Sequence, residues 1–305
     1  MSERPDAAGP PSPGTGSELP DFAQAPEWLA VLRRFRRHRA AMLSAVVLAV
    51  VVACAALADV IAPHGATEQH LDRILEPPGR DFLLGSDTLG RDNLSRILYG
   101  GRISLLVGGA VALISGIVGT SVGLVAGYYG RWIDAVLMRL ADTMLALPGL
   151  MVVIIAARIL GDGVWDVVIV LAAITWMIPA RIVRGKVLAL REREFVEAAR
   201  ALGLPNRRII VRHLLPNLAG EVMVSVSLTV AAAILAESTL SFLGLGVSAT
   251  RTATWGNMLG GNEGFVIIAP WLVWAPGLAI VATALCVNFV GDGLRDSLDP
   301  TQDHR

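Results

Sequence analysis

Few residues in this sequence have the types and spacing that catalysis or cofactor binding would need. The only lysine, Lys186, is followed by a valine, so the Gly-Lys-Ser/Thr signature of a phosphate-binding loop is missing. His64 and His70 stand six residues apart in a stretch that also holds three acidic residues, which is a weak signal for a metal site. The apolar runs contain no His/Asp/Glu or Ser/His cluster. We therefore predict that the chain is not an enzyme and has no catalytic, cofactor-binding or metal-binding residues.

The most informative polar segment lies between two apolar runs, at residues 181–217. It contains Glu197-Ala198-Ala199, and Gly203 follows four residues later. The residues from Arg191 to Leu202 are strong helix formers, Gly203 suits the left-handed position that ends a helix, and Pro205 suits the start of a second one. One side of the first helix is expected to carry Leu188, Phe195, Ala199 and Leu202. The segment predicts a helix–turn–helix at a membrane surface, and an amphipathic loop without function is the alternative.

The elements that must position this segment are membrane spans. Hydrophobic residues make up 54% of the 305 residues and mean hydropathy is +0.59, whereas charged residues make up 17%, against about 25% in soluble domains. A span needs about 20 mostly apolar residues, so we predict an all-α integral membrane protein with about six transmembrane helices. The expected spans are Ala40–Leu57, Ile103–Gly127, Val136–Leu160, Val164–Ala180, Leu218–Ala236 and Phe265–Val290.

Arginines gather in two of the connecting segments, one ahead of the first span and one between spans four and five. Because cytoplasmic segments carry an excess of Arg and Lys, both clusters predict a cytoplasmic N-terminus, and six spans return the C-terminus to the cytoplasm. We expect a disordered cytoplasmic tail at 1–32, an N-terminal helix and extracytoplasmic segment at 33–102, a transmembrane domain at 103–292 and a cytoplasmic tail at 293–305.

Ionisable residues inside or near the spans are candidates for function. Arg139 and Asp142 stand three residues apart and are expected to pair with each other. Glu237 lies near the outer end of span five; a water-exposed helix end is one interpretation, and a gate or a binding-protein contact is the other. Asp59, Arg158 and Asp292 are expected to be solvated near the interfaces.

Small residues and cysteines within the spans are expected to serve packing. Ser115, Gly119, Gly123 and Gly127 recur every four residues, which puts them on one helix face that a neighbouring backbone can approach closely. A pore-lining role for that face is the alternative. The two cysteines, at positions 54 and 286, both lie in apolar runs, where they are read as small packing residues.

The segment around Glu197 to Gly203, with Leu215-Pro216-Asn217 before span five, resembles the EAA loop of permease subunits of ATP-binding-cassette importers. Other motifs resemble the dipeptide/oligopeptide/nickel permeases, and among them the second-permease type, which has one extra helix ahead of a shared five. These motifs are Leu84-Gly85-Ser86-Asp87-Thr88-Leu89-Gly90-Arg91-Asp92, Ser241-Phe242-Leu243-Gly244-Leu245-Gly246, Trp255-Gly256-Asn257-Met258-Leu259 and Gly291-Asp292-Gly293-Leu294-Arg295-Asp296.

The resemblance covers roughly residues 33–300 and implies a type I importer permease fold in the inner membrane. It implies that Glu197, Ala198, Ala199 and Gly203 couple the chain to an ATPase, with the alanines allowing close approach to that partner. The implied partners are a homologous permease, two ATPase subunits that hold ATP and magnesium, and an extracytoplasmic solute-binding protein. Short peptides are the implied substrate; nickel, glutathione and opines stay open. The net charge of zero does not indicate a nucleic-acid partner.

Two rival functions would leave different signals in the sequence. An ion-coupled secondary transporter usually shows inverted repeats and ionisable residues near the bilayer midplane, and neither pattern stands out here. A membrane-embedded enzyme would need a polar cluster within the spans, which the apolar runs lack.

Overall fold

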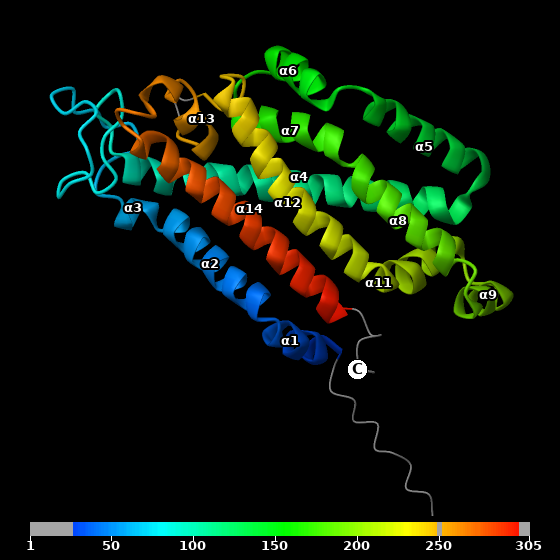
Figure 1. Ribbon diagram of the computed structural model, residues 1–305. Coiled ribbons are helices and arrows are strands. Elements are labelled where there is room, and N and C mark those ends of the chain that lie inside the picture. The colour runs from blue at the N-terminus through cyan, green and yellow to red at the C-terminus, as the bar shows by residue number, and fades with distance from the viewer. Residues whose placement is uncertain (1–26, 249–251, 299–305) are drawn as a thin grey trace, which may run out of the picture.

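The computed structural model describes residues 27–248 and 252–298, which are helical apart from loops and one isolated bridge between Ser86 and Asp92 (Figure 1). The first half of the fold consists of α1 (Glu27–Arg37), α2 (Arg39–Ala56), α3 (Ala58–Ile61), α4 (Asn93–Tyr129), α5 (Arg131–Ala146), α6 (Gly149–Leu160), α7 (Val164–Thr175) and α8 (Met177–Leu190). The second half consists of α9 (Glu194–Ala201), α10 (Asn206–Arg208), η1 (Ile209–Leu214), α11 (Leu215–Asn217), α12 (Ala219–Phe242), α13 (Trp255–Leu259), η2 (Glu263–Phe265) and α14 (Trp271–Leu298).

The described residues include five helices long and apolar enough to cross a membrane, or six spans if the bent pair α5–α6 counts as one. The all-helical fold with about six spans is therefore confirmed. In Figure 1, α2, α14 and α12 lie side by side, and α4 crosses the molecule behind them. The short helix α13 and residues 62–92 lie at one end, which we call the α13 end; α9 lies at the other, the α9 end.

The third expected span is not one continuous helix. Helices α5 and α6 meet at an angle of 89°, so the prediction of a single helix over Val136–Leu160 was wrong. The break falls at Leu147 and Pro148, both of which have extended backbone angles. A proline disfavours the helical conformation of the residue before it, and this explains why α5 ends there. The fourth span departs in the other direction, because the helical segment begun at Val164 continues to Leu190.

The ends of the described chain are more helical than expected. Residues 27–32, assigned to the disordered tail, are the first turns of α1, and residues 293–298, assigned to the C-terminal tail, continue α14. The predictions for residues 1–26 and 299–305 lie outside the described residues.

The small-residue face of α4 packs against α8, as predicted. A Cβ atom added to Gly123 would lie 2.5 Å from the carbonyl oxygen of Ala180, and one added to Gly127 would lie 2.8 Å from Cβ of Val187. Such distances leave room for glycine alone, because real Cβ atoms do not approach this closely. The two helices therefore touch through their backbones.

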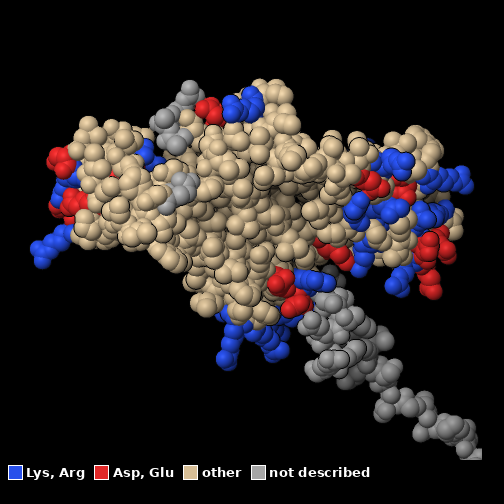
Figure 2. Space-filling view, turned by 45° about the horizontal axis from the view of Figure 1, so that its top comes forward, with Lys and Arg blue, Asp and Glu red and all other residues tan. Residues whose placement is uncertain are grey.

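The surface matches a protein that sits in a bilayer. Many large apolar side chains are exposed, including Ile159 at 78% and Leu43 at 67%, where a soluble monomer would bury most of them. Figure 2 shows charged side chains gathered toward the ends of the molecule, with a broad uncharged surface between them.

Candidate functional site

Helix α9 is followed by the turn that the sequence predicts. Gly203 has φ +74°, in the left-handed region, and its N–H donates to the carbonyl of Arg200 at 2.9 Å. The N–H of Leu204 donates to the carbonyl of Ala199 at 3.2 Å. These two bonds form a Schellman motif, which satisfies carbonyls that the helix end would leave unpaired. The helix itself begins at Glu194, three residues later than expected.

The inner face of α9 rests on a buried cluster of this same chain. Val196 is fully buried and Ala199 is 4% exposed, and both pack in a cluster with Tyr128, Val187 and Ile209. Ala199 therefore packs against this chain itself, and its expected part in coupling stays a prediction. Phe195 and Leu202, which were expected on the same side as Ala199, are exposed. The side chains of Val196 and Ala199 point inward, toward this cluster.

The outer face of α9 is open. Glu197 and Ala198 are exposed, and no ion pair or hydrogen bond involves the Glu197 carboxylate within the described part of the chain. Leu202 is 80% exposed and Phe195 39% exposed, so the segment also presents apolar side chains. Exposed apolar side chains together with an unpaired charge are suited to docking against another protein.

Specific contacts hold this segment against the long helices. The Tyr128 hydroxyl at the end of α4 donates to Oδ1 of Asn206 at 2.8 Å, and the Arg200 guanidinium lies 5.3 Å from the centroid of the Tyr128 ring. A nitrogen of Arg191 donates to the carbonyl of Gly127 at 3.0 Å. The second helix after Pro205 is interrupted, since the six residues of η1 form a π-helix between α10 and α11.

Ion pairs tie α8 to its neighbours close to the same end. Arg184 pairs with Asp134 of α5, and its second contact to that carboxylate is 2.6 Å long. Asp142 pairs with Arg181 of α8, so the expected pair between Arg139 and Asp142 was wrong. Helical spacing made that pair feasible, but the tertiary neighbour supplied a closer cation.

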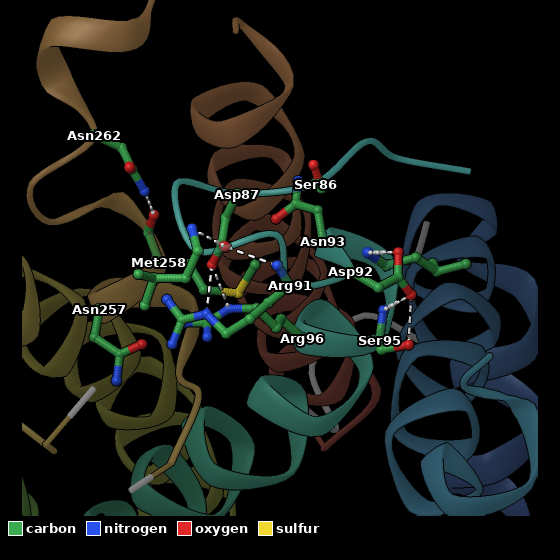
Figure 3. Close-up of polar contacts among 12 residues, drawn as sticks. Ser86, Asp87, Arg91, Asp92, Asn93, Ser95, Arg96, Asn257, Met258 and Asn262 are labelled. Carbon is green, nitrogen blue, oxygen red and sulfur yellow. Dashed lines mark hydrogen bonds and ion pairs between the residues drawn. The ribbon is translucent and has the colours of Figure 1, made fainter. Parts of the chain in front are cut away.

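At the α13 end, Asp87 organises the loop that carries the Leu84–Asp92 motif (Figure 3). Its carboxylate accepts from the backbone N–H groups of Leu89 and Arg91 at 2.8 and 2.9 Å and from Nε of Arg91 at 2.6 Å. Nε of Arg96, on α4, lies 3.7 Å from the same carboxylate, and Arg96 is 3% exposed. The buried carboxylate therefore shapes the turn and lies against two guanidinium groups.

The same motif joins the starts of α4 and α14. Asp92 caps α4 by accepting from the N–H of Ser95 at 3.0 Å. The Asn93 amide donates to the carbonyl of Trp271 at 3.1 Å, and the Trp271 indole donates to the carbonyl of Ser86 at 3.1 Å. Ser86 and Asp92 belong to the motif that carries the resemblance, and these contacts show that they fix the loop in place.

Glu237 lies inside the protein. It is fully buried, so the expectation of a water-exposed helix end was wrong, and a direct contact to another protein is closed to it in this conformation. Ser241 Oγ donates to Glu237 at 2.7 Å and Ser104 Oγ at 3.3 Å, while Ser104 Oγ accepts from the N–H of Trp255 at 3.2 Å. The carboxylate thus links α12, α4 and α13.

The other candidate polar groups lie apart from these sites. The rings of His64 and His70 lie 5.2 Å apart, and both are close to Phe82. Among the described residues, no group of three or more His, Cys, Asp or Glu side chains is placed to hold a metal ion. Asp59 is exposed, and the hydrogen bond from Arg102, at 2.7 Å, lowers the pKa of its carboxyl. Arg158 is exposed too.

Comparison with known proteins assigns the family. Residues 119–304 match the family described as the binding-protein-dependent transport system inner membrane component, and residues 27–78 match the N-terminal transmembrane domain of oligopeptide transport permease C. The chain belongs to this permease family. It is an inner-membrane, multi-pass component of an ATP-binding-cassette transport system, and such permeases are not enzymes.

The similarity to known permeases covers nearly the whole chain. It is 37% identical to the dipeptide transport system permease protein DppC of Alkalihalophilus pseudofirmus over 95% of each chain. It is 40% identical to the oligopeptide transport system permease protein OppC of Haemophilus influenzae, over 90% of this chain and 88% of that one. A solved structure of the MetNI methionine ABC transporter in an inward-facing conformation matches with a TM-score of 0.54 at 16% identity, over 67% of this chain and 97% of that one. That likeness concerns the fold.

Proposed function

We propose that this permease forms half of the translocation pathway of an ATP-driven importer for short peptides. The relatives at 37–40% identity carry the names of dipeptide and oligopeptide permeases, which supports peptides as the substrate class. The observation that carries the ATP-driven part is the exposed surface of α9 and its turn, which presents the unpaired Glu197 carboxylate and the apolar side chains of Phe195 and Leu202. This face is the docking surface for an ATPase subunit.

The complete importer contains this permease, a homologous permease, two ATPase subunits and an extracytoplasmic solute-binding protein. ATP and magnesium bind to the ATPase subunits, because the chain has no Gly-Lys-Ser/Thr loop. The α9 end and both termini lie in the cytoplasm, in keeping with the arginines at that end, and the α13 end receives the binding protein.

A movement of α9 is transmitted to the membrane helices through direct contacts. Its inner residues pack on Val187 of α8 and, through the same cluster, on Leu218 at the start of α12. Helix α8 is in backbone contact with α4 along the glycine face. Displacement of α9 by the ATPase pair therefore shifts α8 and α12 against α4, and the pathway alternates between outward and inward access. Glu237 lies where α12, α4 and α13 meet, which suits the outer gate.

Reconstitution of the whole importer tests this proposal. Proteoliposomes containing the two permeases, the ATPase subunits and the binding protein should accumulate a labelled dipeptide when ATP is supplied on the ATPase side. Glu197→Lys should leave the amount of inserted permease unchanged and reduce ATPase copurification and uptake. Glu192→Lys is the matched control, because Glu192 is 75% exposed in the same segment but precedes α9. Wild-type uptake by Glu197→Lys would contradict the role of α9, and uptake of nickel but not of dipeptide would contradict the substrate class.

A further inference from the structure

Helix α1 lies close to the lipid headgroups, because it directly precedes α2, the first membrane-spanning helix. Helix α2 has 18 residues, so it is about 27 Å long, close to the thickness of the hydrocarbon core, roughly 30 Å. Its first residue, Arg39, therefore lies where hydrocarbon gives way to headgroups. A single residue, His38, separates α2 from α1. The C-terminal end of α1, next to α2, thus lies in the headgroup layer or directly beside it.

Contacts with α14 keep α1 at this level. A Cβ atom added to Gly293 would lie 2.2 Å from Cβ of Ala41 and 3.3 Å from Cε2 of Phe35, so the absence of a side chain there lets all three helices meet. His38 Nδ1 accepts from the N–H of Ala41 at 3.1 Å, and its Nε2 lies 3.8 Å from Asp296. Helix α1 is therefore docked on the end of α14.

Four arginines around α1 have no acidic partner among the described residues. Five arginines occur in residues 33–39, and four of them are exposed without an ion pair in the described ranges 27–248 and 252–298; these four are Arg33, Arg36, Arg37 and Arg39. The cations of α8 differ, because Arg181, Arg184 and Lys186 each pair with an acidic residue of this chain. In Figure 2, basic side chains project from the body at the bottom of the view, where Figure 1 has α1.

We propose that α1 is an interfacial helix whose exposed arginines bind the phosphates of anionic lipids. The charge complementarity is direct: a cluster of unpaired cations lies at the depth of the headgroups, and anionic lipids supply the matching charge. Leu32, which is 48% exposed on the same helix, adds apolar contact with the acyl boundary. The proposal rests on the proposed topology in one respect, namely that the leaflet concerned is the cytoplasmic one.

The test measures which lipid headgroup lies next to α1 in the full-length permease. A fluorophore is attached to Leu32→Cys in a Cys54→Ala, Cys286→Ala background, and the assembled importer is reconstituted in phosphatidylcholine with a small share of spin-labelled phosphatidylglycerol or spin-labelled phosphatidylcholine. Spin-labelled phosphatidylglycerol should quench the fluorophore several-fold more strongly, and the preference should fade as salt is raised. Equal quenching by the two lipids at low salt would overturn the proposal.

Charge variants separate lipid binding from other roles of the arginines. Arg33→Gln, Arg36→Gln and Arg37→Gln together should abolish the preference, whereas the corresponding lysine variant should keep most of it. The matched control replaces three exposed arginines of the α9 end, at positions 207, 208 and 212, by glutamine and should keep the preference in full. A preference that survives in the α1 glutamine variant contradicts the proposal. Because quenching needs neither ATP nor peptide, failure of the importer function would leave this result unchanged.

Discussion

The Tyr128 hydroxyl donates a hydrogen bond of 2.8 Å to Oδ1 of Asn206, which joins the end of α4 to the turn that follows α9. Tyr128→Phe removes this bond and retains the ring under Arg200. A hydrogen bond of this kind contributes about 1 kcal/mol, so amide hydrogen exchange in residues 194–208 should become roughly fivefold faster. Tyr129→Phe is the control, because Tyr129 is 45% exposed and should change nothing. Unaltered exchange in Tyr128→Phe would show that the bond does not hold the segment.

Substitution of Gly203 should disrupt coupling and spare insertion. At φ +74° any side chain is strained by about 1–2 kcal/mol, and a β-branched one by more, although no atom lies within 4 Å of a Cβ added there. Gly203→Val should therefore distort the turn and reduce both ATPase copurification and peptide uptake at normal membrane abundance. Gly203→Asn, which tolerates the left-handed conformation, should retain most activity. Equal activity of the Val and Asn variants would argue against a role for the turn.

The contact between α4 and α8 should be sensitive to a single methyl group. Gly123→Ala places a carbon atom 2.5 Å from the carbonyl oxygen of Ala180, so the helices must separate at a cost of about 1–3 kcal/mol. Gly109→Ala, on the same helix, meets no atom within 4 Å and should be neutral or stabilising by up to about 1 kcal/mol. Thermal unfolding in detergent should place Gly123→Ala below the wild type and Gly109→Ala at or above it. The reverse order would refute the packing described above.

Glu237 should matter to stability through its hydrogen bonds. Glu237→Leu leaves the hydroxyls of Ser104 and Ser241 without their acceptor, which should cost about 1–3 kcal/mol for each unsatisfied group. Glu237→Gln keeps an acceptor oxygen and should lose less. Thr239→Ala is exposed on the same helix and serves as the neutral control in the same thermal unfolding series. A Leu variant as stable as the wild type would mean that the polar junction between α12, α4 and α13 is not stabilising.

Cysteine labelling should show that the two ends of the molecule lie on opposite sides of the membrane. Arg80 and Arg207 are both exposed, at the α13 and α9 ends respectively. In a background without native cysteines, a membrane-impermeant maleimide applied to intact cells, with any outer membrane permeabilised, should label Arg80→Cys and spare Arg207→Cys. Ser86, although in the same loop, is unsuitable because it is fully buried. Equal labelling of both sites would contradict the proposed topology.

Local chemistry explains what could be predicted from the amino-acid sequence. Apolar runs long enough to cross a bilayer predict the spans, because a helix satisfies within itself the backbone hydrogen bonds that lipid cannot supply. The end of α9 at Gly203 follows from the backbone conformations open to glycine, and the small-residue face of α4 follows from helical periodicity alone. Each of these features depends on residues that are close together in the sequence, so it can be predicted from the sequence alone.

Tertiary neighbours decided the rest. Asp142 pairs with Arg181 in place of Arg139, Glu237 is enclosed by α4, α12 and α13, and Ala199 turns inward onto the cluster beneath α9. Tertiary neighbours also decided part of the 89° bend at Leu147 and Pro148. The proline marks the break, but the angle depends on packing. The identity of a side chain limits what it can bind, and only the folded chain determines which of several chemically equivalent partners comes within reach.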